Sequence, residues 1–277
     1  MPTVKDSTSS LSDVSLHYED TGGTGRPVVL IHGWPLNGRS WKDTVPALVA
    51  AGYRVVTYDR RGFGESDKPL TGYTYDTLAD DLAMLLRELD LQDVTLVGFS
   101  MGGGEVARYA SRHHLERVHS VVFAAAVPPY LLHTGDNPDG PLPKTQAASM
   151  TASLTAHQDS FYDGFVTDFF TADGALTVTE EQRQEALALT KEAFKPAALQ
   201  SMAAWGFTDF REDLPAVTVP ALVIHGDSDA VVPFEGSGKR THEALAGSSL
   251  HLIAGGPHGI NVSHAAEFNA ALVDFLD

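Results

Sequence analysis

Residues 94–102 read Val-Thr-Leu-Val-Gly-Phe-Ser-Met-Gly. The first four suit a buried strand, and a stretch with helical spacing follows the G-x-S-x-G motif at residues 103–113. A G-x-S-x-G between a strand and a helix is typical of a nucleophile elbow, a tight turn that exposes a reactive serine. Side chains at positions 98 and 102 would collide with neighbouring chain, which explains the two glycines. We therefore predict that Ser100 is a nucleophile.

Strands and helices alternate on both sides of this turn. Short runs rich in Val and Ile, each typical of a buried strand, occur at residues 28–31, 54–58, 94–97, 118–124, 221–224 and 250–253. Stretches with helical spacing lie between or after them at residues 41–51, 75–89, 103–113, 234–246 and 265–276. This alternation predicts an α/β fold with a mostly parallel central sheet flanked by helices.

The alternation stops between residues 128 and 211. No Val/Ile-rich run occurs there, and windows with helical spacing lie at residues 159–170 and 179–193. The opening stretch, residues 128–143, is rich in Gly and Pro and is predicted to be a loop that crosses the sheet. We predict that residues 128–211 form an inserted helical cap, and that residues 1–127 and 212–277 form the α/β core.

Bulk composition excludes several function classes. Nineteen Lys and Arg against 36 Asp and Glu give a net charge of −17, which repels nucleic acid and anionic membranes. The chain has no cysteine, so disulfides and thiolate chemistry are excluded. Residues 1–15 lack the apolar run of a signal peptide, and no segment approaches 18 consecutive apolar residues. A cytoplasmic location is therefore expected.

A serine hydroxyl is a weak nucleophile and needs a base within hydrogen-bond reach. In a fold of this kind the acid and the histidine follow the serine, on loops after later strands. Residues 255–259 read Gly-Gly-Pro-His-Gly and come directly after the last predicted strand. We therefore predict that His258 is the general base.

The acid is predicted on the loop after residues 221–224, which offers two carboxylates. Asp227 directly follows Gly226, where it suits an Asx turn, whereas Asp229 lies further toward the loop tip. We favour Asp229 as the acid that orients His258, with Asp227 as its structural neighbour and as the alternative.

An oxyanion hole needs two backbone donors directed at the developing charge. The elbow supplies the N–H of Met101. Residues 32–35, His-Gly-Trp-Pro, follow the first predicted strand, and Trp34 is the predicted second donor because Pro35 has no N–H. His32 is interpreted as a residue that organises this loop.

The remaining histidines that we considered have ordinary structural interpretations. His113 and His114 end a predicted helix, His242 lies on a helix surface, and His225 and His251 lie within or beside strands. None belongs to a metal-ligand motif, so no metal site is predicted.

Five motifs together resemble the α/β-hydrolase superfamily: HGWP (32–35), YDRRGFGESDKP (58–69), GFSMGGGEVARY (98–109), HGDSDAVVPFE (225–235) and GGPHG (255–259). More narrowly, they are similar to those of the cofactor-free non-haem haloperoxidases, also classed as perhydrolases and aryl esterases. The resemblance covers almost the whole chain outside the predicted cap. It implies a triad and two oxyanion donors at Ser100, Asp229, His258, Trp34 and Met101. It also implies that residues 59–66 form a loop that buttresses the site.

The activity implied by this resemblance is hydrolysis of small aryl and alkyl carboxylic esters through an acyl-enzyme. Water opens the acyl-enzyme in hydrolysis, and hydrogen peroxide opens it in perhydrolysis. No cofactor is implied, and the partners are a small ester or carboxylic acid and hydrogen peroxide. The predicted cap matches no motif, so its aromatic residues are assigned either to a substrate pocket, with Trp34, Phe161 and Trp205 as lining, or to helix packing.

Other functions on the same fold stay open or are disfavoured. The same triad serves lactonases, γ-lactamases and lyases of the hydroxynitrile type, and the sequence does not separate these from an esterase. An aspartate-nucleophile dehalogenase or epoxide hydrolase is disfavoured because position 100 is serine. A non-enzymatic scaffold is disfavoured because all three triad residue types are present. A homo-oligomer is compatible with the sequence, which does not define the oligomeric state.

Overall fold

The computed structural model describes residues 2–5 and 14–277, so part of the amino-terminal stretch considered for a signal lies outside the described residues. Eight strands form one sheet in the order β1-β2-β4-β3-β5-β6-β9-β10. Their bounds are β1 Thr3–Val4, β2 Leu16–Asp20, β3 Pro27–Ile31, β4 Arg54–Tyr58, β5 Val94–Phe99, β6 Val118–Ala124, β9 Ala221–Gly226 and β10 Ser249–Ile253. The six predicted strands are confirmed, with ends that differ by at most two residues.

Six neighbouring strands of this sheet pair in parallel, as the alternation predicts: β4, β3, β5, β6, β9 and β10. β2 pairs antiparallel with β4 and β1 antiparallel with β2 at one edge of the sheet. The sequence did not predict these two. β1 has only two residues, and β2 is a short Leu-His-Tyr-Glu-Asp run with three polar residues, because an edge strand is not buried on all sides.

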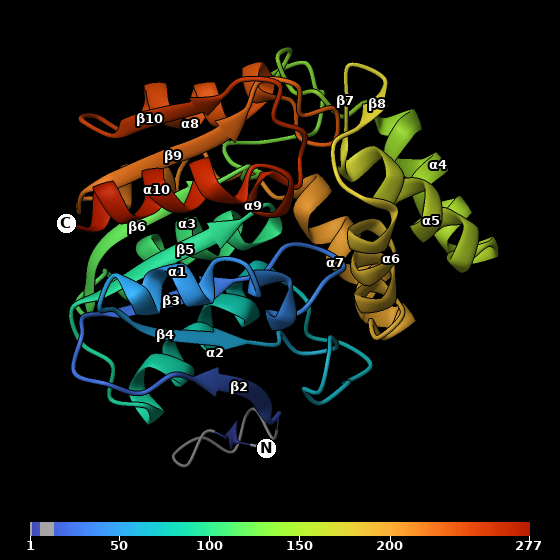
Figure 1. Ribbon diagram of the computed structural model, residues 1–277. Coiled ribbons are helices and arrows are strands. Elements are labelled where there is room, and N and C mark those ends of the chain that lie inside the picture. Colours follow the sequence, from blue (N-terminus) through green and yellow to red (C-terminus); the bar gives the residue numbers. More distant parts are fainter. Residues whose placement is uncertain (1, 6–13) are drawn as a thin grey trace.

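Helices cover both faces of the sheet (Figure 1). α1 (Val45–Ala50) and α10 (Ala265–Leu276) contact each other on one face, and α2 (Tyr75–Glu88) packs against α3 (Met101–His113) on the other. The predicted helix at 41–51 is a 3-10 turn, η1 (Gly38–Trp41), followed by α1. That at 234–246 divides into η3 (Phe234–Gly236) and α8 (Gly238–Ala244). A four-residue helix, α9 (Ile260–Ser263), and the turn η2 (Leu214–Ala216) complete the core.

The segment between β6 and β9 is helical and lies at one end of the sheet (Figure 1). It contains α4 (Lys144–Ala156), α5 (Gln158–Phe169), the hairpin β7 (Thr171–Ala172) and β8 (Ala175–Leu176), α6 (Glu180–Thr190) and α7 (Lys195–Phe207). The windows at 159–170 and 179–193 correspond to α5 and α6. α4 and α7 were not predicted, because small residues fill much of both and no regular apolar stripe marks them.

No helix among the described residues is both long and apolar enough to cross a membrane.

Candidate active site

The turn between β5 and α3 places Ser100 at the carboxyl edge of the sheet. Its backbone takes φ 55° and ψ −118°, a strained region for a residue other than glycine. A Cβ at Gly98 would lie 2.5 Å from the carbonyl oxygen of Gly102, and one at Gly102 would lie 2.6 Å from that of Ile31. The strained turn is braced by the Ser100 N–H, which donates to the Ala124 carbonyl at 2.8 Å. The elbow therefore has the geometry that the G-x-S-x-G motif predicts.

His258 lies in the loop after β10, and its imidazole is fully buried. Its Nε2 is 2.9 Å from Ser100 Oγ, and its Nδ1 is 2.7 Å from Asp229 Oδ2. Since a carboxylate only accepts hydrogen bonds, Nδ1–H donates to Asp229 and Nε2 is free to accept the serine proton. The structure thus brings together the three side chains that the sequence analysis selected from separate loops.

Asp229 is held by donors on both carboxylate oxygens. Oδ1 accepts from the backbone N–H groups of Val231 at 2.9 Å and Val232 at 2.8 Å, while Oδ2 faces His258. Burial alone would raise the pKa of this carboxyl, but the electrostatic interactions and hydrogen bonds with the imidazoles of His258 and His225 outweigh it and hold the pKa below its usual range. The carboxylate is therefore ionised beside the imidazole.

Asp227 has a different position from Asp229. Its side chain is exposed, and its Oδ1 accepts from the N–H of Gly255 at 2.7 Å. It thereby joins the loop after β9 to the loop that carries His258. Of the two carboxylates that the sequence offered, only Asp229 faces the imidazole.

His225 is the site neighbour that the sequence analysis missed. It lies in β9, as predicted, but its Nε2 is only 3.2 Å from Asp229 Oδ2, and both side chains are fully buried. The only signal in the sequence is its position four residues before the acid, at the end of a strand.

The loop after β3 lies directly against the elbow. A Cβ at Gly33 would lie 3.1 Å from Ser100 Cβ, so the next residue, Trp34, starts beside the serine. Met101 is the first residue of α3, and its N–H is one of the donors that a helix start leaves without an intrahelical partner. The helix N-terminus also favours negative charge at this point. Both predicted oxyanion donors therefore belong to segments that adjoin Ser100.

A buried polar network supports this loop from below. His32 accepts the N–H of Arg60 at its Nε2 (3.0 Å), and its Nδ1 lies 2.9 Å from the Gly33 carbonyl. Burial and the Arg60 cation hold the pKa of His32 well below its usual value, so the ring is neutral. Arg60 also forms an ion pair with Glu105 of α3, which accepts from Tyr58 at 2.6 Å. The sequence analysis gave His32 this organising role but did not foresee the Arg60–Glu105 pair.

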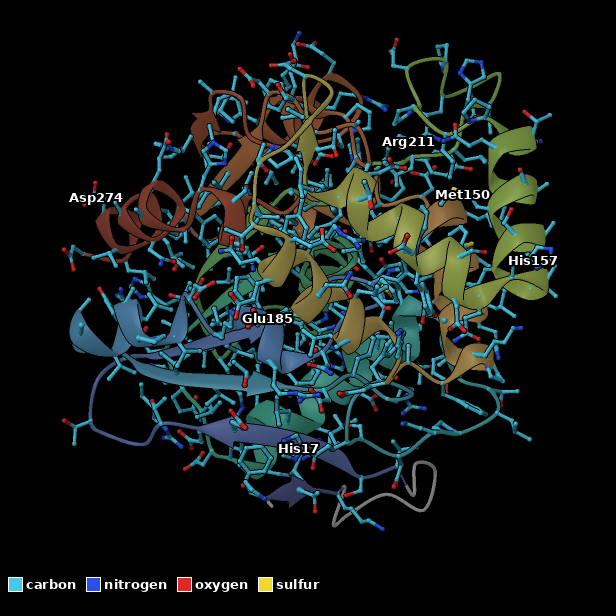
Figure 2. The ribbon with its side chains drawn as sticks, turned by 45° about the vertical axis from the view of Figure 1, so that its right-hand side comes forward. His17, Met150, His157, Glu185, Arg211 and Asp274 are labelled. Atoms are coloured by element: carbon cyan, nitrogen blue, oxygen red, sulfur yellow. The ribbon has the colours of Figure 1, made fainter. Side chains whose placement is uncertain are left out.

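A cavity of about 740 Å³ lies between the insertion and the loop that carries Asp229. Phe161 and Trp205, both predicted as pocket residues, line it together with Phe165 and Val231. The Trp34 ring packs at 6.2 Å from Phe161 and 5.9 Å from Trp205. The apolar part of the cavity therefore adjoins the Trp34 loop. Figure 2 shows His157, which lines the cavity, at the outer end of the insertion where α4 and α5 meet.

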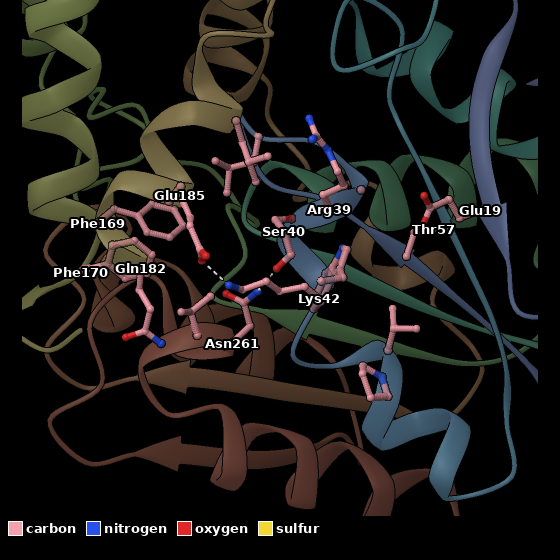
Figure 3. A pocket seen from close by; sticks show the side chains of 18 residues that line it. Glu19, Arg39, Ser40, Lys42, Thr57, Phe169, Phe170, Gln182, Glu185 and Asn261 are labelled. Carbon is pink, nitrogen blue, oxygen red and sulfur yellow. Dashed lines mark hydrogen bonds and ion pairs between the residues drawn. The ribbon is translucent and has the colours of Figure 1, made fainter. Parts of the chain in front are cut away.

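A second cavity, of about 410 Å³, contains none of the predicted site residues (Figure 3). Ion pairs of Arg39 with Glu192 and Lys42 with Glu185 join η1 and the following turn to the insertion around it. Phe169 lines this cavity and also packs edge-on against His258, with ring centroids 4.9 Å apart. Its ring therefore separates the second cavity from the candidate base.

Within residues 2–5 and 14–277, no group of three or more His, Asp or Glu side chains is arranged to hold a metal ion.

Residues 26–265 match the family model described as the alpha/beta hydrolase fold. The chain therefore belongs to the α/β-hydrolase family.

Three similar proteins narrow this class. A non-haem chloroperoxidase of Kitasatospora aureofaciens is 40% identical, with 95% of this chain and 96% of that protein covered. A bifunctional esterase/perhydrolase of Acinetobacter calcoaceticus is 36% identical with the same coverage. The crystal structure of a bromoperoxidase from Bacillus anthracis superimposes with a TM-score of 0.95 at 51% identity, over 99% of each chain. Within the family, this chain is a member of the non-haem haloperoxidase group.

Proposed function

We propose that this chain is a serine hydrolase that cleaves small carboxylic esters through an acyl-enzyme on Ser100 and also catalyses perhydrolysis. The observation that carries the proposal is the chain of contacts from Ser100 Oγ to His258 Nε2 (2.9 Å) and from His258 Nδ1 to Asp229 Oδ2 (2.7 Å). The chloroperoxidase and esterase/perhydrolase names of the relatives agree with it.

In the acylation step Ser100 Oγ attacks the ester carbonyl carbon while its proton passes to His258 Nε2. The ester C–O bond then breaks, and the leaving alcohol takes the proton from His258. Asp229 stays ionised and stabilises the imidazolium that forms between these two transfers.

The carbonyl oxygen becomes an oxyanion during attack, and the N–H groups of Trp34 and Met101 are the proposed donors to it. The buried Arg60–Glu105 pair holds the Trp34 loop to α3, because Arg60 Nη2 also donates to the His32 carbonyl at 2.8 Å. This connection fixes the positions of the Trp34 and Met101 N–H groups relative to each other.

Deacylation repeats the proton transfers with a second nucleophile. Water gives the carboxylic acid, whereas hydrogen peroxide gives a peracid, and in each case His258 takes the proton of the nucleophile and returns it to Ser100. Starting from a free carboxylic acid, the acylation releases water, so acid and peroxide together give peracid and water.

We propose further that residues 128–211 act as a cap that selects the acyl group. The cavity of about 740 Å³ is within the range of small-molecule sites, and Phe161 and Trp205 give it an apolar wall. Such a pocket suits small aryl or alkyl esters. The cytoplasmic location remains a prediction.

Ser100→Ala tests the proposed nucleophile. We expect hydrolysis of p-nitrophenyl acetate to be lost, with a fall in kcat of about 10⁶, while circular dichroism and thermal unfolding stay close to those of the parent. A fluorophosphonate probe should label the parent but not the variant. Full activity in Ser100→Ala would rule out the assignment.

The choice between activities needs a substrate panel. Acyl and aryl esters, lactones and lactams are assayed with and without hydrogen peroxide, and cyanohydrin cleavage is assayed separately. The proposal expects ester turnover, and peracid formation when peroxide and a short carboxylic acid are present. Turnover confined to lactones, lactams or cyanohydrins would contradict it.

A further inference from the structure

The imidazole of His225 is a buried titratable group that the mechanism above does not use. Its Nε2 lies 3.2 Å from Asp229 Oδ2 and 2.8 Å from the carbonyl oxygen of Val232. His258 Nδ1 approaches the same Oδ2 at 2.7 Å. The carboxylate oxygen that faces the catalytic histidine is therefore placed between two imidazoles.

The contacts of His225 define its tautomer. Because the Val232 carbonyl only accepts, Nε2 carries the hydrogen. Nδ1 is buried and has no hydrogen-bond partner in the part of the chain that the structure describes. A second N–H at Nδ1 would be left unpaired, which is costly in a buried site. The Nε2–H of His225 therefore points toward the Asp229 loop.

Both backbone polar groups of Val232, in the loop that carries Asp229, form hydrogen bonds. The N–H of Val232 donates to Asp229 Oδ1 at 2.8 Å, while the carbonyl of Val232 accepts from His225. His225 therefore restrains Val232, the residue whose N–H donates to the far oxygen of the acid, and its Nε2 also lies 3.2 Å from the near oxygen. Removing the ring would loosen both restraints together.

The imidazole of His225 is closely packed on two sides. On the side of α8, a Cβ at Gly238 would lie 2.4 Å from Nδ1, and on the side of η3 the Phe234 ring lies 5.6 Å away. Neither carries a charge. The titratable groups that face His225 are Asp229 and, beyond that carboxylate, His258.

We infer that His225 is a positioning residue for Asp229. Its Nε2–H restricts rotation of the carboxylate and takes up part of its negative charge, so that the orientation and strength of the Asp229–His258 hydrogen bond depend on it. This inference rests on the proposed Ser100–His258–Asp229 mechanism and adds a fourth side chain to it.

The test compares His225→Leu, which removes the donor, with His225→Gln, whose amide N–H can reach the same acceptors. We expect His225→Leu to lower kcat for p-nitrophenyl acetate about tenfold with KM within about twofold. We also expect the acid limb of the kcat/KM profile to move up by about half a pH unit, because Asp229 then interacts more fully with the His258 imidazolium. His225→Gln should recover most of kcat and the original limb.

The matched control is His251→Leu. His251 lies on the neighbouring strand β10, is half exposed and pairs with Glu267. This variant should leave kcat and the pH profile unchanged. Equal kinetics in His225→Leu and His251→Leu would overturn the inference while leaving the proposed function intact, since the latter depends on Ser100→Ala. A loss in His225→Leu that His225→Gln does not recover, with no change in the pH profile, would equally overturn it in favour of a packing role.

A measurement on the parent protein keeps the test decisive if His225→Leu does not fold. Nitrogen-15 spectra of labelled histidine report the tautomer of each ring. The hydrogen of His225 is expected on Nε2, where the Val232 carbonyl accepts it. A ring with its hydrogen on Nδ1 alone would overturn the inference.

Discussion

The carboxyl edge of the sheet and the helical insertion differ in how many of their buried polar groups have hydrogen-bond partners. At the edge, both oxygens of Asp229 and both nitrogens of His258 have close partners, and His225 Nδ1 is the exception. In the insertion, Tyr162 Oη, Ser201 Oγ and Trp205 Nε1 are buried without a hydrogen-bond partner among the described residues. The edge is thus organised by directional hydrogen bonds, and the insertion mainly by packing.

This difference predicts different consequences of substitution. A directional network fails when one donor or acceptor is lost, because the remaining groups stay buried and unpaired. A packed aromatic region adjusts its shape at smaller cost. Changes at the edge should therefore reduce the rate, whereas changes in the insertion should alter substrate preference or stability.

The largest expected effect separates the two carboxylates of the edge. Asp229→Asn should lower kcat by about 10⁴, because the amide no longer favours the required His258 tautomer or the imidazolium. Asp227→Asn is the matched control, since it changes an exposed side chain whose partners are the Gly255 N–H and the Ser228 hydroxyl rather than His258. It should change kcat by less than about threefold. Steady-state kinetics on p-nitrophenyl acetate would measure both, and the reverse ranking would show that Asp227 is the acid.

The Asp229 carboxyl should also make stability depend on pH. Its pKa is lower in the folded chain than in the unfolded chain, so its full contribution to stability is present above the unfolded pKa of about 4. This contribution declines as the pH falls below that value toward the lower folded pKa. Urea unfolding between pH 6 and pH 3 should therefore show a steeper loss in the parent than in Asp229→Asn. Parallel curves would contradict the ionised, stabilised carboxylate.

In the insertion, Phe161→Ala should change selectivity rather than the chemical step. The ring lines the cavity of about 740 Å³, so its removal should raise kcat/KM for hexanoate relative to acetate esters about fivefold. Fluorophosphonate labelling of Ser100 should change little. Phe207→Ala is the control, because Phe207 is half exposed at the end of α7 and does not line the cavity. The same preference in both variants would remove the cavity from the substrate site.

The smallest effect is expected for Tyr162→Phe. The Tyr162 ring is buried against Trp34, but its hydroxyl has no partner among the described residues. Removing the hydroxyl keeps the packing and removes a desolvated polar group, so the free energy of unfolding should stay level or rise by about 1 kcal/mol. Chemical denaturation measures it. A loss of more than about 1 kcal/mol would show that the insertion also relies on directional bonds.

The parallel sheet and the strand-turn-helix around Ser100 could be predicted from local patterns in the chain. Buried strands leave a Val- and Ile-rich signature that needs no tertiary information, and the elbow at Ser100 is fixed locally because only glycine fits at positions 98 and 102. The order of the loops then led to His258 and to the loop that carries Asp227 and Asp229. These features are encoded within a few neighbouring residues.

Contacts between separate elements could not be predicted in the same way. Asp229 and Asp227 are two residues apart, and which one faces His258 depends on how two loops from different strands approach each other. The contact of His225 with Asp229, the Arg60–Glu105 pair and the cavity beside Trp34 likewise join residues from separate elements. α4 and α7 lack an apolar stripe, so their helices depend on packing within the insertion. Local sequence propensity does not predict such contacts, because they join separate elements that meet only when the chain folds.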